Sequence, residues 1–301
     1  MGLPMRAPWL ERTSPALHRF WTRTDKPFPL LREVLVGALL IALLLVVLFT
    51  ATGQRFPSGS PVVVVTSGSM MHCTNGHPPL GRDCTPTSYG RVGAIDPGDL
   101  VFVRHVSAAE DVATKAQGKS STYGDFGDVV VYHRNGSGTA TPIIHRALFY
   151  LQVNADGTYS VPELGIDHAE RLDQPAATSL AGCTIQGGLG RPLVPTDSGF
   201  ITRGDNNPFA DQCPAASISG PARVGWLLGK ARGEVPWVGL VKLFVDDLRG
   251  PTTNFSAAGG DSKVMLVASV AVLLALPYGW RAVRKRMGPK EPGKEPGPPA
   301  P

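Results

Sequence analysis

The chain lacks the charge distribution of a nucleic-acid-binding protein. Its formal net charge is +5 over 301 residues, but the excess lies at the two ends. Residues 1–33 hold six basic and three acidic side chains and residues 281–301 hold six and two, which leaves 17 basic and 19 acidic side chains for residues 34–280. Because that central part has no basic patch interleaved with aromatic residues, the sequence predicts no nucleic-acid partner.

Two stretches lack charged residues and are long enough to enter a membrane. Residues 34–53 are mostly apolar, and about 20 such residues cross roughly 30 Å of hydrocarbon as a helix. Residues 264–280 form a shorter run that ends in a tyrosine and a tryptophan typical of membrane interfaces, and the basic stretch RAVRKR follows it. Basic residues thus flank the outer side of each run. We therefore expect a two-pass plasma-membrane protein with residues 1–33 and 281–301 in the cytoplasm and residues 54–263 outside it.

Each apolar run also has an alternative interpretation. The first could be a cleaved signal peptide, although its apolar core exceeds the usual 7–15 residues and follows a long head. The second is short enough to be a buried core helix. The head has prolines throughout and the tail reads MGPKEPGKEPGPPAP, so both ends are predicted to be disordered.

Cysteine is scarce, and all four cysteines lie in the predicted outer segment, at positions 73, 84, 183 and 213. An even number in an oxidising compartment indicates two disulfides. Sequence order favours Cys73–Cys84 and Cys183–Cys213, although three connectivities are open. The stretch MHCTNGHPPLGRDC also offers cysteine and histidine ligands, but its spacing matches no standard zinc site, so we expect neither a metal nor another cofactor.

The outer segment also lacks helical periodicity over most of its length. Only residues 237–248 have apolar positions at helical spacing, and they predict an amphipathic helix that lies on the membrane or packs on the core. Short runs rich in Val, Ile, Phe and Tyr predict strands at 61–67, 99–106, 127–134, 142–153, 157–162 and 198–204. The fold class is therefore mainly β. Residues 107–126 read as a surface loop, and residues 154–197 read as an inserted subdomain.

The stretch VVVVTSGSMM, residues 62–71, places Ser69 directly after a strand of valines. A serine hydroxyl attacks only when a base removes its proton. No lysine of the outer segment follows a buried strand that would lower its pKa, whereas a histidine needs no such shift. His145 stands in a strongly apolar strand, and FITRGDNNPFAD adds Asp205 and Asp211. The sequence thus contains the parts of a Ser-His-Asp arrangement, although each part alone is weak evidence.

Five motifs together resemble a known family. SGSMM (67–71), GDLVFV (98–103), GDVVVY (127–132), IIHRA (143–147) and FITRGDNNPFAD (200–211) follow the order of the conserved boxes of type I signal peptidases. Bacterial-type members carry lysine where His145 stands, so the chain is similar to the archaeal and endoplasmic-reticulum branch. The resemblance covers about 150 residues, and the two membrane runs resemble members with a C-terminal anchor.

The resemblance implies a fold, an activity and a set of site residues. It implies an antiparallel sheet partly coiled into a barrel, and a serine endopeptidase that removes signal peptides from exported preproteins close to the secretion translocon. Ser69 would be the nucleophile, His145 the general base, and Ser67 with the Ser69 N–H the oxyanion hole. Asp211 is favoured over Asp205 as the partner of His145. Small residues would be required at the first and third positions before the cut.

Some features leave alternatives open. The family has proline three residues after the nucleophile, where this chain has His72, which is a rival base. Met70 and Met71 are adaptable apolar groups that we expect to face substrate or lipid. A peptidase that cleaves only a few special substrates, such as surface proteins, is a further alternative. A non-catalytic, membrane-anchored β-domain for adhesion or surface binding is the alternative from another class, and it predicts that residues 69, 145 and 211 lie far apart.

Overall fold

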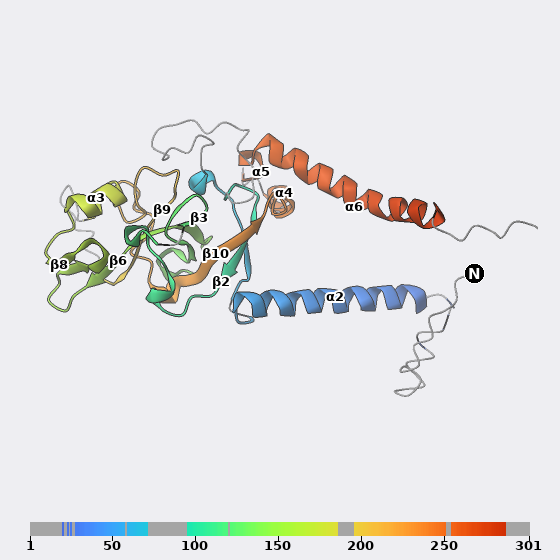
Figure 1. Cartoon of the computed structure of the whole chain (residues 1–301), viewed down its shortest axis with the longest axis horizontal. Coiled ribbons are helices and arrows are strands. Elements are labelled where there is room, and N and C mark those ends of the chain that lie inside the picture. The colour runs from blue at the N-terminus through green and yellow to red at the C-terminus, as the bar shows by residue number, and fades with distance from the viewer. Residues whose placement is uncertain are drawn as a thin grey trace, which may run out of the picture. The chain divides into compact units, whose positions relative to one another are not determined.

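The computed structural model describes most of the chain and divides it into two units. It describes residues 28–57, 59–71, 95–119, 121–185, 196–250 and 254–286, together with residues 20, 23 and 25. One unit covers residues 1–61 and the other covers residues 62–301 (Figure 1). Most of the predicted disordered head and tail lies outside the described residues.

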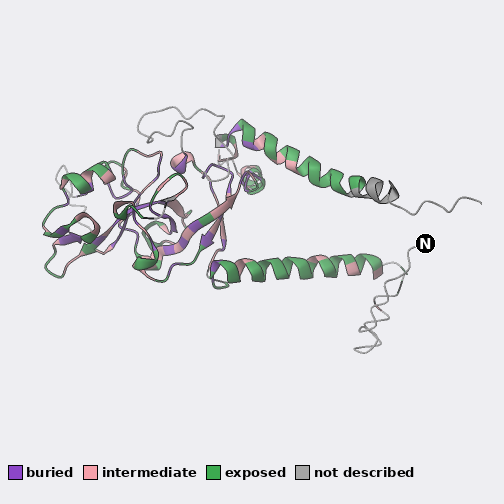
Figure 2. Cartoon of the chain, viewed as in Figure 1, coloured by how far each residue is buried: buried purple, intermediate pink, exposed green. Residues whose placement is uncertain are grey.

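The described part of the first unit is dominated by helix α2 (Phe28–Thr52). Its apolar side chains are mostly exposed (Figure 2). Its threonine hydroxyls form hydrogen bonds within the helix, and Thr52 Oγ1 donates to the Leu48 carbonyl at 2.6 Å. Among the described residues, α2 is the one helix long and apolar enough to cross a membrane, which suggests that the chain associates with a membrane. The helix predicted at 34–53 is confirmed and begins earlier, at Phe28.

The described residues of the second unit form the α-helices α3 (Pro175–Ala181), α4 (Leu240–Arg249), α5 (Asn254–Ala257) and α6 (Gly260–Arg286). The amphipathic helix predicted from residues 237–248 is confirmed as α4. The second apolar run lies inside α6, which continues to Arg286 and so includes the first residues of the predicted tail. The crossing of α6 through a membrane, and hence the two-pass topology, stays a prediction.

The core of the second unit is an eight-stranded antiparallel sheet with the order β1-β2-β10-β5-β6-β7-β8, in which β9 also pairs with β6. The strands are β1 (Val62–Val64), β2 (Leu100–Arg104), β5 (Val129–Tyr132), β6 (Ile143–Val153), β7 (Tyr159–Val161), β8 (Ile166–Ala169), β9 (Gly199–Arg203) and β10 (Leu227–Val235). All six predicted strands occur, each within its predicted range. The mainly β, antiparallel character is confirmed, whereas a domain of signal-peptidase type stays a prediction.

Strand β10 is central to the sheet, yet the sequence analysis missed it. Its sequence, LLGKARGEV, holds two glycines and three charged residues, so it does not look like a buried strand. A Cβ on Gly229 would lie 2.1 Å from the Arg104 carbonyl oxygen, so this close approach of β10 to β2 requires glycine. Lys230 and Arg232 both form ion pairs with the buried Asp128, at 2.9 Å each. These hydrogen bonds outweigh burial, which by itself raises the pKa of Asp128, and the net effect lowers that pKa.

The two predicted excursions have structure of their own. Residues 107–126 contain the 3₁₀ turns η4 (Ala109–Asp111) and η5 (Lys115–Gln117) and a hairpin of β3 (Ser121–Thr122) and β4 (Asp125–Phe126). Residues 154–197 contain β7, the turn η7 (Pro162–Leu164), β8 and α3. The buried residues of this second excursion pack in one cluster with those of β6 and β9, so it extends the main core.

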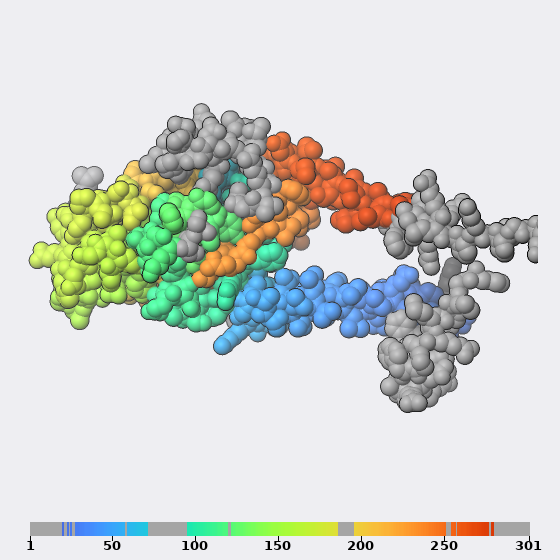
Figure 3. Space-filling model, viewed as in Figure 1, coloured from blue at the N-terminus to red at the C-terminus, as the bar shows by residue number. Residues whose placement is uncertain are grey.

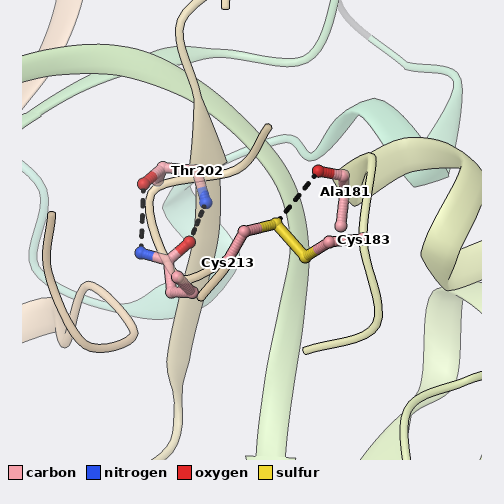
Figure 4. Close-up of a disulfide and its surroundings, with 5 residues drawn as sticks. Ala181, Cys183, Thr202 and Cys213 are labelled. Atoms are coloured by element: carbon pink, nitrogen blue, oxygen red, sulfur yellow. Dashed lines mark hydrogen bonds between the residues drawn. A yellow bond between two sulfur atoms is a disulfide. The ribbon is translucent and has the colours of Figure 1, made fainter. Parts of the chain in front are cut away.

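One predicted disulfide is confirmed. Cys183, just after α3, is bonded to Cys213, with the two Cα atoms 6.0 Å apart (Figure 4). The bond joins the second excursion to the segment that carries Asp211, and the Ala210 N–H also donates to the Ala181 carbonyl at 2.8 Å. Cys73 and Cys84 lie outside the described residues, as does His72.

Asp99 connects the sheet to the segment that leads into α4. Its side chain is fully buried and accepts hydrogen bonds from the backbone N–H groups of Asp96 and Trp237, at 2.9 and 3.0 Å. Burial is the main cause that raises the pKa of Asp99 to about 7. Between about pH 4 and pH 7 the folded state therefore holds a proton that the unfolded state has released.

We predict that the contribution of Asp99 to stability decreases as the pH rises from 4 to 7, because the unfolded state releases this proton at a lower pH than the folded state does. The contribution of Asp99 to the free energy of unfolding should fall by up to about 1.4 kcal/mol per pH unit and become constant above pH 7. Thermal unfolding followed by circular dichroism at several pH values would measure it. An Asp99→Asn variant should lose this part of the slope, and an unchanged slope would contradict the assignment.

Candidate active site

The turn that presents Ser69 follows β1 directly. The chain leaves the sheet at Val65, whose N–H donates to the Asp99 carbonyl, and forms the 3₁₀ turn η2 (Gly68–Met70). Met70 is buried in the core cluster below the turn, together with Val65 and Val101. A side chain anchored on each side of the turn thus holds the half-buried Ser69 at the surface of the sheet.

His145 lies in β6, directly opposite Val130 of β5. Only 5% of its surface is exposed. Its Nε2 lies 2.9 Å from Ser69 Oγ, although 76 positions separate the two residues in sequence. The histidine predicted as a base is therefore within hydrogen-bond reach of the predicted nucleophile.

Asp211 completes a chain of hydrogen bonds. Its Oδ2 lies 2.7 Å from His145 Nδ1, and its side chain is fully buried. Because a carboxylate only accepts, this contact assigns the proton of the neutral imidazole to Nδ1 and leaves Nε2 as the acceptor for the Ser69 hydroxyl. The preference for Asp211 over Asp205 agrees with this geometry.

Two further residues hold Asp211, and the sequence analysis missed both. The Tyr132 hydroxyl donates to Asp211 Oδ2 at 2.8 Å and the Thr202 hydroxyl donates to the same oxygen at 2.7 Å. Burial first, and then the charge of Asp211, raise the pKa of Tyr132 well above its usual value, so it stays a neutral donor. Both residues sit in apolar strands, and only the strand-to-strand register could have identified them.

Asp205, the other acid of this segment, is paired with a buried arginine. It forms a bidentate ion pair with Arg146, with Nε–Oδ1 at 2.8 Å and Nη2–Oδ2 at 2.5 Å. Arg146 is fully buried and its Nη1 also donates to backbone carbonyls of residues 122–127. This carboxylate therefore neutralises a buried arginine that joins β6 to the β3–β4 hairpin, and the catalytic role assigned to Asp205 stays a prediction.

The turn GDNN, residues 204–207, also holds Ser69 in place. The Asn206 N–H donates to the Ser69 carbonyl at 2.8 Å, and the Asn206 side-chain amide donates to the Gly68 carbonyl at 3.1 Å. A Cβ on Gly204 would lie 2.5 Å from the Ser69 carbonyl oxygen and 2.9 Å from His145 Nε2, so only glycine fits there. The turn is thus built to approach both residues closely.

The remaining predicted site residues have mixed outcomes. Ser67 is exposed, and its Oγ lies 3.3 Å from Ser69 Oγ, so the two hydroxyls are side by side. Met70 and Met71 are only 1% and 5% exposed, which corrects the prediction that they face substrate or lipid. Met70 packs in the core cluster with Val65 and Val101, and the Met71 sulfur lies close to Gly68.

A largely apolar groove of about 690 Å³ opens at Ser69 and His145. Its walls come from β1 and from the start of β6, with Ile143 and Ile144, and from Asn207 and Ile218. Strand β1 stands at the end of the strand order, as a receptor for an added strand would. Lys242 of α4 also lines the groove, and its Nζ is paired with Asp246 at 2.5 Å.

No protein-family model matches this sequence, and no curated protein matches it either. Within the part of the chain that the structure describes, no three His, Cys, Asp or Glu side chains are grouped like metal ligands.

We predict that Asp205 stabilises the folded protein. Asp205→Asn leaves the buried Arg146 without its counter-charge and should lower the free energy of unfolding by about 3–5 kcal/mol. Asp125→Asn is the matched control, because it breaks the partly exposed pair with Lys115 and should cost about 1 kcal/mol or less. Denaturant unfolding measures both. Equal effects of the two variants would contradict the distinction.

Proposed function

We propose that this protein is a serine endopeptidase that removes signal peptides from exported preproteins. The observation that carries the proposal is the continuous chain of contacts from Ser69 through His145 to Asp211, with distances of 2.9 and 2.7 Å. The five motifs that resemble type I signal peptidases supply the nature of the substrate.

The first chemical step uses the histidine as a base. His145 Nε2 accepts the proton of Ser69 Oγ while that oxygen attacks the scissile carbonyl carbon. The imidazolium that forms is stabilised by the Asp211 carboxylate, whose Oδ2 also accepts hydrogen bonds from Tyr132 and Thr202. Because the carboxylate is buried, its interaction with the imidazolium is little screened by water.

The following steps need a site for the oxyanion and a proton for the leaving group. The Ser69 N–H and the Ser67 hydroxyl are the donors proposed for the oxyanion, and the Ser67 hydroxyl rotates toward it from its position near Ser69 Oγ. The imidazolium then protonates the leaving amine, and the acyl group remains on Ser69 Oγ. Water attacks this ester in the same way, with His145 again as the base, and the free serine is restored.

The groove supports an extended peptide as the substrate. A segment that pairs with β1 would place alternate side chains against the walls of the groove, and the walls near Ser69 are apolar. Ser69 follows the end of α2 by only 17 residues, so the chain keeps it within reach of a membrane surface. The Cys183–Cys213 disulfide supports an extracytoplasmic location.

The non-catalytic alternative is less well supported. It predicts that Ser69, His145 and Asp211 are scattered over the β domain, whereas each neighbouring pair lies within hydrogen-bond distance. A buried carboxylate that holds a histidine against an accessible serine has no evident use in an adhesion domain.

We predict that cleavage depends on both serines, to different degrees. In cells that also express a reporter preprotein, Ser69→Ala should abolish the mature form. Ser67→Ala should lower the rate of cleavage by about 10²- to 10³-fold, as expected for one lost oxyanion donor. Immunoblotting of precursor and mature reporter measures the rate.

Ser179→Ala is the matched control, because Ser179 is an exposed hydroxyl on α3. This variant should cleave normally. Full processing by a folded, membrane-inserted Ser69→Ala variant would contradict the proposed function.

A further inference from the structure

Helix α4 presents an unusual apolar face to its surroundings. Four of its apolar side chains are exposed, with exposed fractions of 52% for Val241, 48% for Phe244, 37% for Val245 and 70% for Leu248. At 3.6 residues per turn these four positions fall within an arc of about 100°, the width of a face that is normally buried. The exposed residues therefore form one continuous stripe, which we call the α4 stripe.

The rest of the helix fixes the direction in which the α4 stripe faces. Leu240 and Leu243 are fully buried and pack with Val64 of β1 and with Trp237. Because these contacts hold α4 on the sheet through one side, the helix cannot rotate to bury the stripe against the same core. The stripe must instead find an apolar environment outside the domain.

Three of the four charged residues of α4 lie on a side separate from the stripe, while Asp247 lies on the side of Leu240 and Leu243. Lys242 and Asp246 pair with each other one turn apart, and Arg249 follows on the same side of the helix. Over residues 237–263 three basic and three acidic side chains cancel. This segment therefore does not indicate a partner that is recognised by net charge. It indicates a neutral, apolar environment.

The α4 stripe contacts α5, the short helix that precedes α6. The rings of Phe244 and Phe255, in α5, meet edge to face with centroids 5.4 Å apart. The Trp237 indole N–H donates to Ser269 Oγ of α6 at 3.2 Å, which ties α6 to the base of α4. Figure 3 shows the orange atoms of α4 beside the first turns of α6. Exposed apolar side chains then follow along α6, at Val264, Val267, Val270, Leu273, Leu274 and Leu276.

The two helices run in different directions. Figure 1 views α4 along its own axis, while α6 extends across the picture, so α4 crosses the line of α6. If α6 enters a membrane, a helix that runs across it, as α4 does, lies parallel to the membrane surface.

We propose that α4 is an in-plane membrane anchor, whose α4 stripe lies among the acyl chains at the surface of a phospholipid bilayer. The apolar face of such a helix reaches about 5–10 Å below the headgroup boundary. The inference goes beyond the peptidase function and does not require it. Because α4 packs on Val64 and Lys242 lines the groove, this anchor also holds the groove that ends at Ser69 against the bilayer.

Photo-crosslinking of the full-length chain in phosphatidylcholine vesicles tests the proposal. The photoreactive residue p-benzoyl-phenylalanine would replace Leu248 in one variant and, as the matched control, the neighbouring Arg249 in another. After irradiation, mass spectrometry of the protein measures the lipid adduct. We expect at least about five-fold more adduct at position 248 than at position 249, because the two side chains face different sides of the helix.

Val241 provides a second position on the α4 stripe if the change at Leu248 lowers expression or folding, which circular dichroism would show. Equal lipid adducts at positions on and off the stripe would overturn the proposal. So would a crosslink from position 248 to a second copy of the chain, since that result would identify the stripe as a self-association surface. None of these readouts depends on peptidase activity, so failure of this inference and failure of the proposed function are distinguishable.

Discussion

The site depends on one buried oxygen atom. Asp211 Oδ2 accepts hydrogen bonds from the Tyr132 and Thr202 hydroxyls and lies 2.7 Å from His145 Nδ1, while Asp211 Oδ1 has no hydrogen-bond partner within the described part of the chain. Three donors that converge on one oxygen fix the carboxylate, and the carboxylate fixes the tautomer and the direction of the imidazole. Without that oxygen, nothing would fix the proton on Nδ1, and Nε2 would not be held toward Ser69 as a hydrogen-bond acceptor. Each donor comes from a different strand, so the sheet must be assembled before the site exists.

The buried ion pair between Arg146 and Asp205 gives the site its shape. Arg146 follows His145 in β6, and its guanidinium holds Asp205 of the GDNN turn together with the backbone of the β3–β4 hairpin. That turn in turn binds the Ser69 carbonyl through Asn206. The two acidic residues of one short segment therefore have separate tasks, since one stabilises the fold and the other supports the histidine. The disulfide to Cys213 closes the same segment onto α3 and joins the second excursion to the site (Figure 4).

The sequence was informative where local patterns decide the structure. Strands such as β5 and β6 were predictable because short runs of Val and Ile have few other uses, and α4 was predictable from its spacing. β10 was not, because its glycines and charges are explained only by its neighbours Arg104 and Asp128. Ser69, His145 and Asp211 were identified from motifs, but their convergence depends on strand register. The prediction that Met70 and Met71 face substrate or lipid was wrong, because the sequence does not tell whether an apolar residue beside Ser69 points into the core or out to the surface. Tyr132 and Thr202 were missed because they look like ordinary strand residues.

The kcat of an Asp211→Asn variant on a peptide that carries a signal-peptidase cleavage site is the most direct test of the central claim. Asparagine keeps the size of the side chain and removes the charge that stabilises the imidazolium. The account predicts a fall in kcat of roughly 10²- to 10⁴-fold, with KM and the thermal unfolding midpoint close to those of the unmodified protein. A kcat equal to that of the unmodified protein would contradict it.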